Sequence, residues 1–132
     1  MLDDALKTFP DECCGFLFGD ETAGGDRNFS EIMVVDNSKE GDRRRRFEIS
    51  ARDYLRAERF ADETGLALLG VYHSHPSAPA IPSEVDRAAA QPYFSYVIVS
   101  VFGEEIRGVT SWRLNENHRF EPETFAEPII FQ

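Results

Sequence analysis

The chain has 132 residues, 42% of them hydrophobic and 11 of them phenylalanine, so it is long enough to bury a core. It is too short for an eight-stranded β/α barrel, which usually needs about 250 residues. Its formal net charge of −10 argues against general binding to nucleic acid or to an anionic membrane surface. The sequence has no membrane-spanning apolar run and no secretory leader, so we expect a cytoplasmic protein. The only cysteines, Cys13 and Cys14, are adjacent, and we expect both to stay reduced.

The first part of the chain predicts a short helix followed by two strands. Leu2, Leu6 and Phe9 have helical spacing, and Pro10 ends the helix that they indicate. Strands are expected over residues 14–19 and 29–35, with a glycine-containing loop over 22–27 between them.

A second helix and a central strand follow. Residues 45–49 are expected to form a short strand that leads into a helix over 51–64. Ser50 is the expected N-cap of this helix, and Gly65 closes it. Leu66 to His75 is a continuous apolar run that ends in histidine, which is typical of a strand buried on both faces.

The last third of the chain predicts a stiff loop, a helix and three strands. Together with the first part it indicates an α/β (α+β) fold with a mixed sheet flanked by helices. We expect Trp112 in the core, and we expect Ile129, Ile130 and Phe131 to pack either on the body or on a second subunit. The expected segments are the proline-rich loop 76–82, a helix over 83–91, and strands over 93–102, 106–114 and 118–120.

The most specific stretch of the sequence is His73-Ser74-His75-Pro76, followed by a carboxylate at Asp86. Two imidazoles two residues apart point the same way on an extended backbone, because side chains alternate with period two. Two nitrogens and one carboxylate oxygen are a common ligand set for a catalytic zinc, with a fourth position left for water. A single buried histidine at a strand end is more often satisfied by a backbone carbonyl, but the His-x-His-Pro pattern favours metal ligands.

Ser83 and Asp86 form a Ser-x-x-Asp pattern that resembles a helix capping box. The cap and a ligand role for Asp86 are compatible. A helix that begins beside the strand end would hold the carboxylate near both imidazoles.

The combined pattern resembles the signature of the JAMM-motif (MPN-plus, JAB-domain) zinc metallo-isopeptidases. The stretch from Pro10 to Gly19 resembles the small prokaryotic members, in which a glutamate precedes Cys-Gly and an apolar strand, and Glu12 is the match. The resemblance covers a core of about residues 5–114 and leaves a tail over 121–132. It implies one JAB/MPN domain over residues 1–132, with a fold related to the cytidine-deaminase-like architecture.

The resemblance also implies a mechanism. One Zn²⁺ per chain would be held by His73, His75 and Asp86, and a zinc-bound water would attack an amide carbonyl. Glu12 would act as general base and then general acid, and Ser83 would donate a hydrogen bond to the developing oxyanion. Ser74 is expected to point away from the metal and to serve the structure.

The substrate class follows from the resemblance alone. Relatives of this type cleave peptide or isopeptide bonds at the C-terminus of a ubiquitin-like, β-grasp sulfur-carrier protein that ends in Gly-Gly. Whether the bond is to lysine, to cysteine or to a longer peptide stays open, as do the oligomeric state and any gating by the loop 76–82.

Two other functions compete with this interpretation. Many relatives of the fold have lost their ligands and act as scaffolds, although Glu12, His73, His75, Ser83 and Asp86 are all present here. A zinc nucleoside deaminase would need His-x-Glu and a Pro-Cys-x-x-Cys pair, which the sequence does not have.

The run from Arg43 to Arg46 is a second local anomaly in an acidic chain. It predicts either the docking of an acidic partner or carboxylate, or a solvated loop neutralised by Glu40, Asp42 and Glu48. The net charge argues against contact with nucleic acid.

Overall fold

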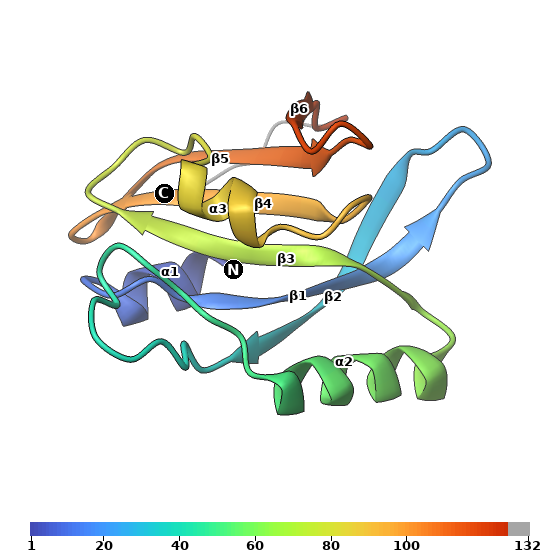
Figure 1. The fold of residues 1–132 in the computed structure, drawn as a ribbon, viewed down its shortest axis with the longest axis horizontal. Coiled ribbons are helices and arrows are strands. Elements are labelled where there is room, and N and C mark those ends of the chain that lie inside the picture. The colour runs from blue at the N-terminus through green and yellow to red at the C-terminus, as the bar shows by residue number, and fades with distance from the viewer. Residues whose placement is uncertain (127–132) are drawn as a thin grey trace.

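The computed structural model describes residues 1–126, which form one six-stranded mixed sheet with helices on its faces (Figure 1). The strand order is β2-β1-β3-β4-β5-β6, and only β3 and β4 pair in parallel. The predicted α+β class with a mixed sheet is therefore confirmed. The elements are α1 (Leu2–Thr8), β1 (Cys14–Glu21), β2 (Arg27–Val35), α2 (Ala51–Thr64), β3 (Ala67–Pro76), α3 (Glu84–Ala89), β4 (Ser95–Phe102), β5 (Glu105–Leu114) and β6 (Phe120–Glu123).

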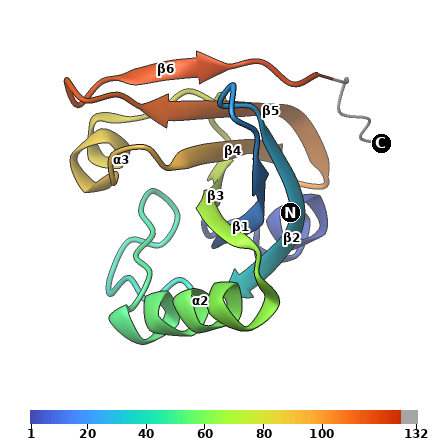
Figure 2. The ribbon, with the colours of Figure 1, turned by 90° about the vertical axis from the view of Figure 1, so that its right-hand side faces the viewer.

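The two faces of the sheet build separate core clusters, because alternate residues of β1 and β3 point in opposite directions. Phe16 and Val71 belong to the cluster on the α2 side, where Tyr54 of α2 packs edge-on against Phe16. Leu17 and Tyr72 belong to the other cluster, together with residues of α1. Figure 2 shows α1 and α2 on different sides of these central strands. The expectation that β3 is buried on both faces is confirmed.

The second helix begins and ends where the sequence predicts. The Ser50 hydroxyl accepts a hydrogen bond of 3.1 Å from the Asp53 amide, which satisfies one free donor of the first turn. Gly65 takes a left-handed conformation with φ of 75° and its amide donates to the Ala61 carbonyl. The helix leads directly into β3 and so sets where the central strand starts.

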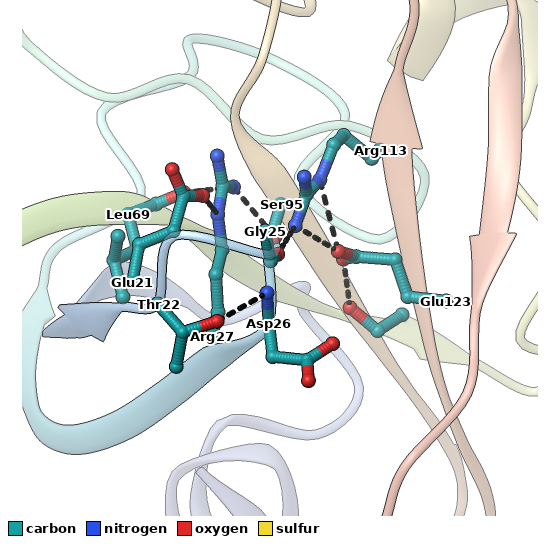
Figure 3. A network of polar contacts seen from close by, with 10 residues as sticks. Glu21, Thr22, Gly25, Asp26, Arg27, Leu69, Ser95, Arg113 and Glu123 are labelled. Atoms are coloured by element: carbon teal, nitrogen blue, oxygen red, sulfur yellow. Dashed lines mark hydrogen bonds and ion pairs between the residues drawn. The ribbon is translucent and has the colours of Figure 1, made fainter.

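The sheet curls until the β1–β2 hairpin approaches the other edge of the sheet. Figure 3 shows the polar network that links them. Arg27 of β2 donates to the Ser95 hydroxyl at 2.8 Å and to the Leu69 carbonyl at 3.1 Å. Arg113 of β5 donates to the Gly25 carbonyl at the hairpin turn and pairs with Glu123 of β6 at 2.7 Å. These bonds close the end of the sheet where β3 begins.

The predicted short strand over residues 45–49 is wrong. The chain makes a turn at 43–45 and then runs without strand pairing. Side chains take the place of a partner strand, because the Asn37 amide oxygen accepts from the Glu48 amide at 3.1 Å. The Glu48 carbonyl accepts from both the amide and the hydroxyl of Ser38.

The C-terminal third also departs from the prediction at several boundaries. The helix expected over 83–91 ends at Ala89, because Pro92 disfavours a helical conformation at Gln91, whose amide donates to the Tyr96 hydroxyl at 2.7 Å. The strand expected from residue 93 begins at Ser95, because Tyr93 has a φ of 68° in the preceding turn.

The last strand is longer than expected and lies in what the sequence predicts as a tail. β6 runs from Phe120 to Glu123 and pairs with β5. Trp112 is half-buried and stands outside both core clusters, so its expected place in the core is wrong. The predicted packing of Ile129, Ile130 and Phe131 lies outside the described residues.

Two simpler expectations concern the cysteines and the membrane. Cys13 and Cys14 are free and buried, and burial raises the pKa of Cys13 to about 12, so this thiol is unreactive at neutral pH. None of the helices in residues 1–126 has the length and hydropathy needed to cross a membrane.

Candidate metal centre

The end of β3 brings two imidazoles together. The register pairs His73 with Cys14 of β1 and His75 with Ser100 of β4, so this end of β3 is flanked by a paired strand on each side. Residues 73 and 75 face the same side, and the Nε2 atoms of the two rings lie 3.1 Å apart. Both side chains are buried, at 1% and 9% exposure. The predicted convergence of the two histidines is confirmed in this geometry.

The third donor comes from α3, where the predicted capping box forms. The Ser83 hydroxyl accepts from the Asp86 amide at 3.0 Å, and the Asp86 carboxylate accepts from the Ser83 amide at 2.9 Å. This reciprocal cap turns Oδ2 of Asp86 toward the strand end, 3.3 Å from Nε2 of His73 and 3.1 Å from Nε2 of His75.

The three donor atoms form a nearly regular triangle with sides of 3.1, 3.1 and 3.3 Å. Ligand bonds of about 2.0–2.2 Å arranged tetrahedrally around zinc place neighbouring donor atoms about 3.3 Å apart. The donor set and its spacing therefore fit a tetrahedral metal ion with one position left open.

Backbone and aromatic contacts fix both rings. Nδ1 of His75 lies 2.9 Å from the Pro79 carbonyl oxygen, so this nitrogen carries the proton and Nε2 presents its lone pair. Phe47 stacks on the His73 ring, with centroids 4.5 Å apart. The ring that supplies one donor is thus held by a hydrogen bond and the other by packing.

The loop 76–82 is tied to the sheet and does not hang free. The Ser100 hydroxyl donates to the Ala78 carbonyl and the Thr110 hydroxyl donates to the Ala80 carbonyl, each at 2.6 Å. With the contact between His75 and Pro79, three consecutive carbonyls of the loop are bonded to side chains. These bonds set the position from which α3 starts.

Glu12 stands beside the triangle, two residues before β1. It is 3% exposed, and its Oε1 has no hydrogen-bond partner among residues 1–126. A carboxylate oxygen of Glu12 lies within 4.8 Å of the donor nitrogens of His73 and His75. Burial, helped by the charge of Asp86 and opposed by the charges of His75 and Arg46, raises the pKa of Glu12 to about 8 in total.

The charges of the site favour metal ligation. Burial opposes ionisation of Asp86, but the close approach of the His73 and His75 imidazoles and the hydrogen bond from the Ser83 amide outweigh it and hold the pKa of the carboxyl well below its usual range. Burial lowers the pKa of His73, which keeps that imidazole in the neutral form that binds metals. Burial also lowers the pKa of His75, but its contacts with Asp86 and Pro79 raise it overall.

The two serines have different positions. Ser83 is exposed at the start of α3, and its hydroxyl oxygen already accepts from the Asp86 amide, so its proton is free to be donated elsewhere. Ser74 points to the opposite face of β3, where its hydroxyl accepts from the Cys13 amide at 2.8 Å. The expectation that Ser74 points away from the metal position is confirmed.

Two residues that the sequence did not single out also shape the site. Phe47 stacks on His73, as described above. Asn37 uses its whole side-chain amide: Nδ2 donates to the carbonyls of Glu12 and Arg46, and Oδ1 accepts from the amides of Lys39 and Glu48. Neither residue has a ligand spacing or a periodicity, so the sequence alone holds no signal for these contacts.

A cavity of about 440 Å³ adjoins the triangle on the α2 side of the sheet. His73 and Asp86 form part of its wall, Val71 and Tyr96 are buried residues in it, and Arg46 lies at its rim. The donor triangle is therefore accessible from a pocket of the size that small ligands and peptide segments occupy.

Comparison with known proteins agrees with this geometry. Residues 1–115 match the family of prokaryotic homologs of the JAB domain. The chain belongs to this family. It is 31% identical over 115 residues to the CysO-cysteine peptidase of Mycobacterium tuberculosis, covering 86% of this chain and 75% of that protein. It is 28% identical over 109 residues to the desampylase of Pyrococcus furiosus, covering 82% of this chain and 70% of that protein.

Solved structures share the architecture. A protein from Salinibacter ruber superimposes with a TM-score of 0.72 at 40% identity, over 96% of this chain and 84% of that one. A JAB1/MPN domain protein from Archaeoglobus fulgidus superimposes with a TM-score of 0.58 at 18% identity, over 93% of this chain and 85% of that one. The JAB/MPN fold predicted from the sequence is confirmed.

Proposed function

We propose that this JAB-family chain is a zinc-dependent hydrolase that cleaves a peptide or isopeptide bond at the C-terminus of a ubiquitin-like, sulfur-carrier-type protein. The observation that carries the proposal is the triangle of donor atoms from His73, His75 and Asp86, with the unpartnered, buried carboxylate of Glu12 beside it. A buried carboxylate oxygen without a hydrogen-bond partner is costly unless a ligand or a reaction uses it.

One Zn²⁺ held by His73, His75 and Asp86 would supply a Lewis acid that lowers the pKa of water and polarises an amide carbonyl. The neutral His73, the ionised Asp86 and the Nε2 lone pair of His75 are the ligand forms that such an ion needs. Because Asp86 and His75 are themselves fixed by hydrogen bonds to neighbouring backbone, binding the ion requires little rearrangement.

Glu12 is suited to move a proton. A carboxyl with a pKa of about 8 lies close to neutral pH, where it can take a proton in one step and return it in the next. Within the described part of the chain the Glu12 side chain makes no hydrogen bond to either imidazole, so its carboxylate is not engaged by the residues of the triangle. We assign Glu12 the role of general base toward the attacking water and general acid toward the leaving amine.

Ser83 is suited to stabilise the oxyanion. Its oxygen is engaged with the Asp86 amide, which orients the hydroxyl while leaving its proton free. The same side chain therefore caps α3 and can donate to the carbonyl oxygen of a bound substrate.

The substrate class is supported by the names of the relatives, which include a CysO-cysteine peptidase and desampylases. A relative in Thermus thermophilus, 43% identical over 49 residues, is named a probable TtuB-protein conjugate cleaving protease. We infer a carrier that ends in Gly-Gly, because a tail without side chains can pass closely over the buried histidines.

The competing function is an inactive scaffold of the same fold. Its sequence would be free to lose the donor atoms or the proton carrier, whereas all five proposed residues are present and four of them converge. The convergence favours the enzyme.

The deciding experiment compares Glu12→Gln, His75→Ala and the parent for zinc content and for cleavage of a β-grasp carrier whose Gly-Gly tail is extended by a short peptide. We expect Glu12→Gln to keep about one zinc per chain while hydrolysis falls at least ~100-fold. His75→Ala should lose both. Glu58→Gln, the same substitution at an exposed position of α2, is the control and should match the parent. Equal activity of Glu12→Gln and the parent would refute the role of Glu12 as general base. A parent protein without affinity for zinc would favour the scaffold function.

A further inference from the structure

The arginine run Arg43–Arg46 is not used by the chemistry proposed above. All four residues are exposed on the loop between β2 and α2. Residues 39–48 hold five basic and three acidic side chains, a net charge of +2, whereas the rest of the chain carries −12. The loop is therefore a positively charged patch on an otherwise acidic molecule.

The loop is anchored by hydrogen bonds to the backbone beside the candidate metal centre. The Glu12 amide donates to the Arg43 carbonyl at 2.7 Å, and the Asn37 side chain donates to the carbonyls of Glu12 and Arg46 at 3.1 and 3.0 Å. Directly after the run, Phe47 stacks on His73. Figure 2 shows this loop between α2 and α3.

The charges of the run are available to a partner. Within residues 1–126 the only ion pair of the run is Arg45 with Asp42, at 3.6 Å and with both side chains largely exposed. Such exposed pairs contribute little to stability and exchange readily for another carboxylate. Among residues 1–126 the Arg43 side chain donates from Nε, to the Lys39 carbonyl, and its terminal nitrogens have no partner there. Arg46 and Lys39 line the same cavity as His73.

We propose that the loop Lys39–Arg46 is a docking surface for an acidic face of the carrier protein whose C-terminal tail enters the site. Guanidinium groups match carboxylates in paired hydrogen bonds, and their number here exceeds what the loop's own acidic residues use. An acidic partner is repelled by the rest of the surface, so the run would orient it with its tail toward Glu12. The inference rests on the proposed function and adds to it the charge of the substrate protein.

The test measures kcat/KM for two substrates at low ionic strength. One is a β-grasp carrier of net negative charge with an extended Gly-Gly tail, and the other is a short peptide that reproduces only that tail. For R44Q/R45Q, which spares the two arginines whose carbonyls anchor the loop, we expect the ratio of carrier to peptide kcat/KM to fall roughly tenfold. Raising the salt from about 0.05 to 0.5 M should reduce the ratio for the parent much more than for this variant.

The matched control is R56Q/R59Q, which removes the same charge from α2. An unchanged ratio for R44Q/R45Q, or an equal fall for the control, would overturn the docking surface. If the parent cleaves neither substrate, the proposed function fails, and docking is then decided by the Kd of the uncleaved carrier for the parent and for R44Q/R45Q. Equal Kd values would refute docking too, as would tighter binding of a single-stranded oligonucleotide to the same arginines.

Discussion

Replacing Glu12 by glutamine should change how the stability of the metal-free protein depends on pH. In the folded chain the Glu12 pKa is raised from its ordinary value of 4.5 to about 8, mainly by burial. The folded state therefore binds more protons than the unfolded state between these two pH values, and stability falls as pH rises through this window. Below about pH 4.5 both states are protonated at this position and no difference from glutamine remains.

The size of this stability effect follows from the rise in the Glu12 pKa. With each pKa unit equivalent to about 1.36 kcal/mol, ionising Glu12 in the folded protein costs at most about 5 kcal/mol. Water that enters the adjoining cavity reduces this cost, so we expect a difference in unfolding free energy of about 2–4 kcal/mol above pH 8.5.

Urea unfolding followed by circular dichroism, with a chelator present, measures the gap at several pH values between 5 and 9. All other titrating groups occur in both proteins, so the difference between Glu12→Gln and the parent isolates this position. We expect the free energy of unfolding of Glu12→Gln to increase relative to that of the parent as pH rises. A difference that stays constant from pH 5 to 9 would refute the account of Glu12 as a carboxyl buried without a partner.

Three further substitutions test the surroundings of the site. Phe47→Ala removes the ring stacked on His73, and we expect zinc affinity measured by competition with a chelator to fall about tenfold. Asn37→Ala removes the side-chain partner of two carbonyls and two amides, those of Glu12, Arg46, Lys39 and Glu48. Urea unfolding should show that the free energy of unfolding falls by about 2–3 kcal/mol. Gly70→Ala would drive a Cβ into the Ser95 carbonyl where β3 and β4 pair, so its melting temperature should drop sharply, whereas Gly108→Ala, which has open space, should melt close to the parent.

The features that the sequence predicts correctly are clearest at β3. The apolar run and the period-two spacing of His73 and His75 predicted a buried strand that ends in two converging imidazoles, and the structure has both. The Ser-x-x-Asp pattern predicted a cap that holds a carboxylate, and this too forms. These features are local, because strand alternation and helix capping depend on a few neighbouring residues.

The features that cannot be predicted from the sequence are clearest in the loop between β2 and α2. Residues 45–49 have a strand-like composition, yet the side chain of Asn37 bonds the backbone that a partner strand would have paired. The stacking of Phe47 on His73 and the bond between Glu12 and Arg43 join parts of the chain that are far apart in sequence. Trp112 was misplaced because a large apolar side chain in a strand predicts burial without saying how well the opposite layer covers it.

The sequence predicts three candidate donor atoms, the strand that bears two of them and the helix cap that bears the third. Their arrangement in a triangle of metal size, with an Oε1 of Glu12 beside it that has no partner among residues 1–126, depends on the tertiary structure. So does the position of the cationic loop, which is bonded to the Glu12 backbone and lines the cavity beside His73. The physical reason is that periodicity and capping act within one element, whereas desolvation of Glu12 and the placement of the loop depend on how separate elements pack.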